Sequence, residues 1–304
     1  MDGIINVYKE AGFTSHDVVA KLRGICRQKK IGHTGTLDPQ ATGVLPVCLG
    51  SATRACEMLT DRTKEYVAEL LLGKITDTQD TTGTVLEERE VAVDEAQVRE
   101  VIGSFVGGYD QIPPMYSALK VNGKKLYELA RAGKEVERQA RHVDLPAIEI
   151  LEFRLPVVKF RVECSKGTYI RSLCADIGGK LGCGGTMQSL VRTRVGEFRL
   201  TDALTLTQLQ ELRDTGRLEE ALLPTDRIFA DFNAVHVEEK WRKLIDNGNA
   251  FYPGQTMEQT TYPVGEWVRV YREDDSFVGI YAYDGAKEWY KPVKIFPSNT
   301  ESRK

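Results

Sequence analysis

Apolar and polar residues are spaced in the first quarter of the chain in patterns that predict strands and one helix. Residues 3–8 and 65–72 each have the composition of a β-strand, and the second run ends at Gly73. The apolar run 44–49 predicts a further, buried strand. Between the first two strands, Ser15 is expected to cap a helix, with Asp17 favourably placed in its first turn. The helix presents one apolar stripe, formed by Val18, Val19, Leu22, Ile25 and Cys26.

The middle of the chain mixes helical and strand patterns. Asp94 and Gln97 form a capping box at the start of a helix that closes at Gly107-Gly108. Thr205 and Gln208 have the same spacing and predict another short helix. The remaining predicted elements are a turn at Asn122-Gly123, a short basic helix ending at Gly133, two strands in 143–164 around Pro156, and a helix over 168–181.

The pattern changes after about residue 233. A helix near 238–246 is followed by three short alternating runs, 267–271, 277–283 and 289–295, separated by polar turns. We therefore expect a catalytic or binding domain over residues 1–232 and a small β-rich domain over 233–304. The larger part lacks strict βαβ alternation, which predicts an α+β fold with a mixed, mainly antiparallel sheet flanked by helices.

Charge is unevenly distributed along this chain of 304 residues, whose formal net charge is only −3. Residues 21–30 contain five cations and no acid, and residues 111–142 contain seven Lys or Arg against three Glu. Local basic segments on a mildly acidic protein suggest contact with a polyanion. The alternative for either segment alone is a solvated helix face.

The six cysteines form no CxxC pair and have no histidine pair at zinc-ligand spacing. Several lie within apolar runs, so we expect small core residues in a reducing compartment rather than disulfides. The N-terminal segment lacks the apolar core of a signal peptide, and no run approaches a membrane span. These features predict a soluble, cytoplasmic protein.

The stretch "GHTGTLDPQATG" concentrates turn residues around a single acid, Asp38. It is not a P-loop, because no Gly-Lys-Ser/Thr closes it, and its glycine order differs from a dinucleotide fingerprint. A loop held on a buried strand commonly presents a reactive side chain. The alternatives are an ordinary Asp-Pro turn at Asp38 and a hydrogen-bonded loop histidine at His33.

Five segments together resemble the TruB family of tRNA pseudouridine synthases. They span residues 4 to about 195 in the family's order, and the tail after residue 233 more loosely resembles the RNA-binding PUA module. The resemblance implies a pseudouridine synthase fold with a PUA-like domain. The matching segments are "NVYKEAGFTSHDVV", "GHTGTLDPQATGVLPVCLG", "TKEYVAELLLGKITDTQDTTG", "IPPMYSALKVNGKKLYELARAG" and "CSKGTYIRSLCADIGGKLGCGGTMQSLVRT".

The resemblance implies an activity on uridine 55 in the T loop of tRNA, without metal, redox cofactor or nucleotide. The bond between C1′ and N1 is broken, the base turns, and C1′ is rejoined to C5. The family's catalytic acid corresponds to Asp38. This carboxylate could attack C1′, add to C6 of the base, or remove the C2′ proton to give a glycal, and the sequence does not choose among these.

The resemblance also implies roles for residues around the target base, which must be flipped out of its stack. Tyr66 corresponds to the residue that stacks on the flipped uracil, and Arg171 to the arginine that pairs with the catalytic acid. Leu190 would pack on the base, with Tyr169 and Lys64 flanking the pocket. Without the family context, Tyr66 would be a core tyrosine, Arg171 part of a surface ion pair and Leu190 a core leucine.

Further residues are implied to contact the RNA. His33 corresponds to a histidine that fills the space left by the extruded base, and Asp80 to a carboxylate that orients RNA or the arginine, with turn capping as its alternative. Lys9, Lys29 and Lys30 are candidates for phosphate contact. The basic segment 111–142 is expected to fold over the RNA as a thumb.

Four functions are compatible with these sequence features. The first is a stand-alone, monomeric synthase that needs no protein partner, and the second is a tRNA folding factor with secondary catalysis. The third is the family's guide-dependent relative within a ribonucleoprotein, although this chain has no long lysine-rich tail. The fourth is an aspartate-dependent glycoside hydrolase, which would require a second carboxylate facing Asp38.

Overall fold

A central mixed sheet carries the larger part of the molecule. The computed structural model describes residues 1–121 and 123–297, and within them eight strands form this sheet in the order β1-β3-β13-β4-β12-β11, with β2 on β3 and β14 on β13. Every pairing is antiparallel except β13 with β3, so the predicted mixed, mainly antiparallel sheet is confirmed. The strands are β1 Gly3–Lys9, β2 Ile31–His33, β3 Thr42–Leu49, β4 Lys64–Leu72, β11 Ala147–Arg154, β12 Val157–Cys164, β13 Gly185–Val195 and β14 Phe198–Arg199.

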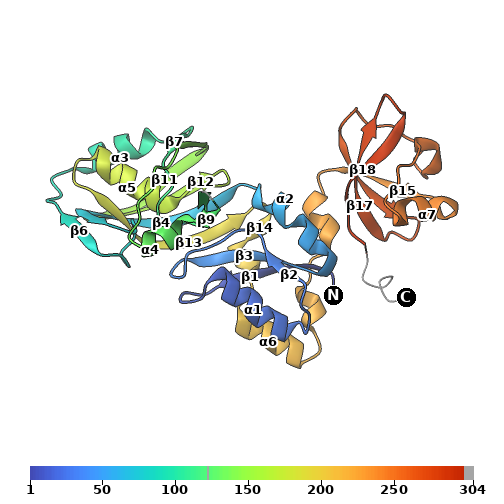
Figure 1. The fold of residues 1–304 in the computed structure, drawn as a ribbon, viewed down its shortest axis with the longest axis horizontal. Helices are drawn as coiled ribbons and strands as arrows, with labels where there is room; N and C mark the ends of the chain where they lie inside the picture. The colour runs from blue at the N-terminus through green and yellow to red at the C-terminus, as the bar shows by residue number, and fades with distance from the viewer. Residues whose placement is uncertain (122, 298–304) are drawn as a thin grey trace.

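Helices cover this sheet in two groups (Figure 1). Helices α1 (Ser15–Ile25) and α6 (Leu206–Asp214) pack their apolar stripes against β1 and β3 in one core. Helices α3 (Glu95–Gly103) and α5 (Ile170–Lys180) cover β4 and β12 in a second core. The 3-10 helix η1 (Gly50–Ala55) and the short α2 (Cys56–Thr60) lie on the opposite face of β3 from α1.

The start of α1 differs by one residue from the sequence prediction. Thr14, not Ser15, is the N-cap, because its hydroxyl accepts a hydrogen bond from the Asp17 amide at 3.1 Å while Asp17 bonds back to the Thr14 amide. The capping boxes predicted at Asp94 and at Thr205 are both present. Ser15 is instead buried, and its hydroxyl serves the neighbouring loop.

The basic segment 111–142 forms small elements beside the main sheet. Strands β7 (Tyr109–Gln111) and β10 (Arg141–Val143) pair with each other, and β8 (Lys120–Val121) and β9 (Lys124–Lys125) form a hairpin that precedes α4 (Leu126–Arg131). The predicted turn at Asn122-Gly123 falls between β8 and β9, and Asn122 lies outside the described residues. A further hairpin joins β5 (Lys74–Thr76) and β6 (Val85–Glu88).

A separate four-stranded sheet follows residue 232. It consists of β15 (Asn233–Val237), β16 (Trp267–Arg272), β17 (Phe277–Asp284) and β18 (Trp289–Ile295), with its own core. The helix predicted near 238–246 is shorter: a 3-10 turn, Glu239–Trp241, precedes α7 (Arg242–Asp246). Strand β15 pairs parallel to β16 and has no counterpart among the sequence predictions, because its five residues carry little alternation.

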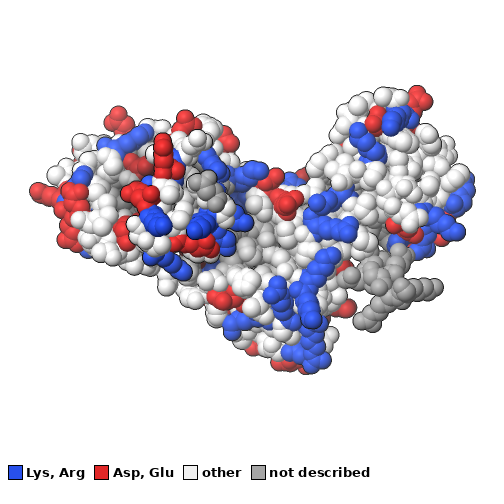
Figure 2. Space-filling model, in the orientation of Figure 1, with Lys and Arg blue, Asp and Glu red and all other residues white. Residues whose placement is uncertain are grey.

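The two parts share a hydrophobic core at their junction. Phe296 and Ile280 from the second sheet pack with Phe229 and Ile228, and the Phe229 and Phe296 rings lie 5.9 Å apart. Figure 2 shows Lys and Arg side chains gathered around α1 and toward the second sheet, whereas the opposite end has mixed charge. Among the described residues, no helix is long and apolar enough to cross a membrane.

Candidate active site

Asp38 lies in the loop that connects β2 to β3, between two buried residues of that loop. Its neighbours Leu37 and Ala41 are 3% and 2% exposed and pack into the core beneath β4. The Leu37 amide donates to the Ser15 hydroxyl at 2.9 Å, which ties the loop to α1. The Asp38 side chain itself remains 38% exposed. Buried apolar anchors on both sides therefore hold an accessible carboxylate.

Arg171 is the immediate partner of that carboxylate, as expected. Its Nε donates to Asp38 Oδ2 at 2.9 Å and its Nη2 to Oδ1 at 3.3 Å, a two-point pairing. The guanidinium is buried in the first turn of α5 and also donates to the carbonyl oxygens of Thr78 and Tyr116. Backbone groups thus fix the arginine, and the arginine fixes Asp38 in orientation.

Asp80 combines the two roles considered for it from the sequence. Its Oδ2 lies 3.8 Å from Arg171 Nε, within ion-pair distance. Its Oδ1 accepts from the Thr78 hydroxyl at 2.8 Å and from the Thr82 amide at 3.0 Å, which is turn capping. The carboxylate therefore both stabilises its own turn and adds negative charge beside the arginine.

Tyr66 and Leu190 project from adjacent strands toward the Asp38 loop. Tyr66 on β4 pairs in register with Arg192 on β13, and Leu190 lies two residues before Arg192, so all three share one face of the sheet. Tyr66 and Leu190 are each 8% exposed and belong to the same core as Leu37. Residues 38, 66, 171 and 190 accordingly surround one location.

Tyr169 immediately precedes α5 and borders this location. Its side chain makes no capping hydrogen bond to α5, and its backbone amide donates to Gln111 Oε1 at 2.8 Å, which links α5 to β7. Burial raises the pKa of the Tyr169 hydroxyl, so it stays protonated at neutral pH.

Three buried cations lie beneath the loop. Lys9 is fully buried, and its ammonium donates to the carbonyl oxygens of Glu10, Pro39 and Ala41. Burial lowers the pKa of Lys9 to about 8. The expected phosphate contact is therefore wrong for Lys9, because its ammonium is enclosed by the turn that follows Asp38.

Lys64 is likewise buried, at 6% exposed, and donates to the carbonyls of Thr60 and Arg62. Burial lowers its pKa to about 8. Its ammonium therefore supports the backbone beside β4, and a position of Lys64 flanking the pocket stays a prediction.

Arg192 is the functional neighbour that the sequence did not suggest. It is 1% exposed, and its guanidinium donates to Val44 O at 2.7 Å and to Gly35 O at 3.3 Å, so it bridges both ends of the Asp38 loop. Its charge also acts on the Tyr66 hydroxyl, whose pKa is raised by burial and lowered in part by Arg192. The only signal in the sequence is that Arg192 stands two residues after Leu190, so on a strand both would share one face.

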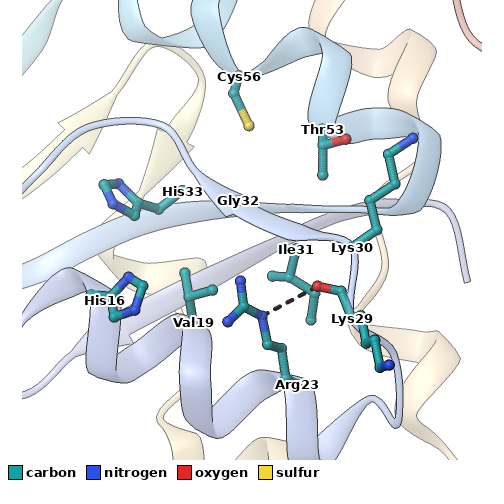
Figure 3. Close-up of a pocket in the computed structure, with 10 residues that line it drawn as sticks. All are labelled: His16, Val19, Arg23, Lys29, Lys30, Ile31, Gly32, His33, Thr53 and Cys56. Atoms are coloured by element: carbon teal, nitrogen blue, oxygen red, sulfur yellow. Dashed lines mark hydrogen bonds between the residues drawn. The ribbon is translucent and has the colours of Figure 1, made fainter.

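A basic groove of about 470 Å³ lies between α1, β2 and η1 (Figure 3). Lys29 and Lys30 line it and are exposed, which agrees with their expected position, and His16 and Arg23 lie on the α1 side. His33 lines the end nearest the Asp38 loop, where its Nδ1 accepts from the Gly35 amide at 3.3 Å. Burial lowers the pKa of His33, so its ring is neutral at neutral pH and suited to stacking.

Two family models match this chain in succession. The model described as "TruB family pseudouridylate synthase (N terminal domain)" matches residues 23–170, and the model described as "tRNA pseudouridylate synthase B C-terminal domain" matches residues 171–230. The second match begins at Arg171, so the ion pair between Arg171 and Asp38 joins the two matched regions.

Curated relatives and solved structures match nearly the whole chain. The tRNA pseudouridine synthase B of Lachnoclostridium phytofermentans is 53% identical over 306 residues, covering 97% of this chain and 100% of the relative. That of Alkaliphilus oremlandii is 48% identical over 295 residues, covering 97% of each. A chain in a Cbf5-Nop10-Gar1 complex and one in an H/ACA RNP bound to a substrate RNA containing 2′-deoxyuridine are 29% and 27% identical. Each gives a TM-score of 0.73 and covers 97% of this chain and 84% of its own.

Proposed function

Because this chain belongs to the TruB family of pseudouridylate synthases, we propose that it converts uridine to pseudouridine at position 55 in the T loop of tRNA. The observation that carries the proposal is the accessible carboxylate of Asp38, held at two points by a buried arginine. The relatives that cover nearly the whole chain are named for this activity.

The reaction replaces one C–N bond by one C–C bond and leaves the composition of the nucleotide unchanged. The C1′–N1 bond breaks, a C1′–C5 bond forms, C5 loses its proton and N1 gains one. Arg171 sets the direction of the Asp38 oxygens, so that the carboxylate meets the sugar or base without first reorienting. The three routes open to the carboxylate, at C1′, C6 or the C2′ proton, all begin from this geometry.

Flipping the base costs a few kcal/mol, which contacts in the pocket must offset. We assign that stabilisation to Tyr66 and Leu190, whose side chains border Asp38 from two adjacent strands. A stacked aromatic ring contributes about 1–3 kcal/mol per base. His33 is suited to fill the vacated position in the RNA stack, because its neutral ring lies at the loop end of the basic groove.

Phosphate contact falls to the exposed cations of the groove, Lys29 and Lys30, and to the basic segment 111–142. Such contacts supply affinity that depends on salt but do not select the uridine. The four-stranded sheet after residue 232 is proposed to be a PUA-like module that extends the RNA-binding surface.

We further propose that the chain acts alone in the cytoplasm, as a monomer and without an obligatory protein partner. The guide-dependent alternative has structural support, since the similar chains with TM-scores of 0.73 come from ribonucleoprotein or protein complexes. Pseudouridine formation on naked, unmodified tRNA by the purified chain would support the stand-alone function. Activity that appears only after a guide RNA or protein is added would contradict it.

The decisive experiment compares wild type with Asp38→Asn on unmodified tRNA, mapping pseudouridine at every position. The variant should lose activity while it still binds tRNA, because the amide preserves the size of the side chain but removes its charge. Asp61→Asn is the matched control, since Asp61 is also exposed and ion-paired but has Lys166 as its partner instead of Arg171. An active Asp38→Asn protein would refute the assignment, and refolding assays with the same variant would separate a chaperone role from catalysis.

A further inference from the structure

Cys56 is a partly exposed thiol in the wall of the basic groove (Figure 3). Its side chain extends from the start of α2 toward β2 at Gly32, and the groove continues past it to Lys29 and Lys30 on one side and His33 on the other. Among the described residues that line the groove there is no carboxylate. Partial burial and the neighbouring Glu57 carboxylate act against a Cys56 thiolate, so its reactivity depends on the adjacent Cys48.

Cys48 lies directly beside Cys56, although the two residues belong to different elements. Cys48 on β3 pairs in register with Gly32 on β2, so positions 48 and 32 face the same side of the sheet. On that side, a Cβ added to Gly32 would stand 3.3 Å from Cys56 Sγ. The missing side chain of Gly32 therefore leaves room for the Cys56 sulfur next to Cys48. The interaction between the two thiols lowers the pKa of Cys56 and raises that of Cys48.

We propose that Cys56 is a peroxide-oxidisable site with Cys48 as its resolving thiol, so that the two form a reversible disulfide in the wall of the groove. The Cys56 thiolate attacks one oxygen of hydrogen peroxide, giving a sulfenic acid and, after protonation of the leaving hydroxide, water. The Cys48 sulfur then attacks the Cys56 sulfur. An S–S bond forms, the S–O bond breaks, and the departing hydroxide takes the Cys48 proton as a second water. A dithiol reductant reverses the reaction by exchange.

The expected consequence is weaker RNA binding, and this part rests on the proposed function. The disulfide draws the Cys56 sulfur from its seat on Gly32 toward β3, and Gly32 immediately precedes His33 at the loop end of the groove. A displaced β2 moves His33 and the exposed lysines relative to one another. We expect the oxidised protein to bind unmodified tRNA about tenfold more weakly, the scale of one lost hydrogen bond to a charged group.

The first experiment treats the purified full-length chain with hydrogen peroxide and maps its thiols by peptide mass spectrometry. Wild type should show a Cys48–Cys56 cross-link that dithiothreitol removes. Cys48→Ala should instead accumulate a Cys56 sulfenic acid that dimedone traps, and Cys56→Ser should leave Cys48 reduced because Cys48 is fully buried. Cys26 and Cys164 are internal controls, since burial raises the pKa of each to about 11.

Binding is then measured before and after oxidation, each variant against its own reduced form. A fall in tRNA affinity that occurs in wild type, is reversed by dithiothreitol and is absent in Cys56→Ser would support the proposal. Peroxide that leaves Cys56 as unreactive as Cys26 would overturn it, as would a mapped disulfide that leaves affinity unchanged. The thiol mapping needs no RNA, so it remains informative even if the proposed activity on tRNA fails.

Discussion

Within the described part of the chain, Arg192 forms no ion pair. Its guanidinium instead donates to neutral backbone oxygens and so holds the site in place. A buried guanidinium costs free energy unless its N–H groups are paired, and here backbone carbonyls at Gly35 and Val44 supply the partners. These two residues bracket the Asp38 loop, so the guanidinium sets the distance between the loop ends. Arg192 also pairs in register with Tyr66 across the two strands, which places the same guanidinium on the face of the proposed stacking residue.

Arg192→Lys should therefore reduce kcat by about 100-fold, the scale of a 1 Å misplacement of reacting groups, with a smaller effect on KM. Lysine keeps the charge but cannot span the two carbonyl oxygens of Gly35 and Val44 with a planar fork. Steady-state kinetics on tRNA, with circular dichroism to verify folding, tests this expectation. Arg194→Met is the control, because Arg194 lies on the same strand as Arg192 but pairs with Glu163 of β12. Equal losses in both variants would argue against a positioning role.

The buried Lys9 should make the free energy of unfolding depend on pH. Burial lowers its pKa to about 8 in the folded protein, against an ordinary value near 10.5, so between these values the unfolded chain binds more protons. The contribution of Lys9 to the free energy of unfolding is least favourable below pH 8 and should rise as the pH increases toward 10. Urea unfolding of wild type and Lys9→Met at several pH values isolates this term. Wild type should gain stability relative to the variant over that interval, and a constant difference would contradict the prediction.

At the level of elements, two adjacent residues at the start of α1 have different roles: Thr14 stabilises the helix, and Ser15 holds the Asp38 loop. Thr14 caps the helix, whereas the Ser15 hydroxyl accepts the buried Leu37 amide of the Asp38 loop. The same helix terminus therefore has one side chain for its own backbone and one for the site.

Thr14→Ala should cost about 1 kcal/mol of stability through the lost cap and leave kcat nearly unchanged. Ser15→Ala leaves the Leu37 amide without its partner, which costs about 1–3 kcal/mol, and should also lower kcat by loosening the loop. Denaturant unfolding and turnover measured on both variants check the contrast. Loss of kcat in Thr14→Ala without loss in Ser15→Ala would reverse the assignment.

This first turn also shows how far the sequence predicts the structure. The helix, its stripe and the buried strand after the loop follow from periodicity, but Thr14 and Ser15 are equivalent cap candidates until tertiary contacts distinguish them. Short strands such as β2 and β15 carry too few residues for a periodic signal. The pairing of Asp38 with Arg171 was expected through family resemblance, whereas Arg192 depends on strand register, which local sequence does not encode.

On the scale of the whole molecule, the distribution of charge predicts how RNA binding responds to salt. Lys29 and Lys30 are exposed in a groove without acids, whereas other surface cations often have acidic partners, as Lys159 has in Glu69. Only the unscreened cations are expected to release counterions from RNA.

Replacing Lys29 and Lys30 together by Ala should weaken tRNA binding at low salt and reduce the slope of log affinity against log salt by about 1 for each lysine. Lys159→Ala should leave that slope unchanged. Filter binding across a salt series measures both. An unaltered slope in the double variant would remove the groove from the RNA-binding surface.

The order of strands in the central sheet has a consequence for the protein during its synthesis. Strand β13 is inserted between β3 and β4, which are both complete by residue 72, yet β13 itself ends at Val195. Until that segment leaves the ribosome, two strand edges have no partner between them and the Asp38 loop lacks Arg192. A nascent or prematurely terminated chain is thus catalytically silent, and its open edges make it a substrate for chaperones rather than a modifier of RNA.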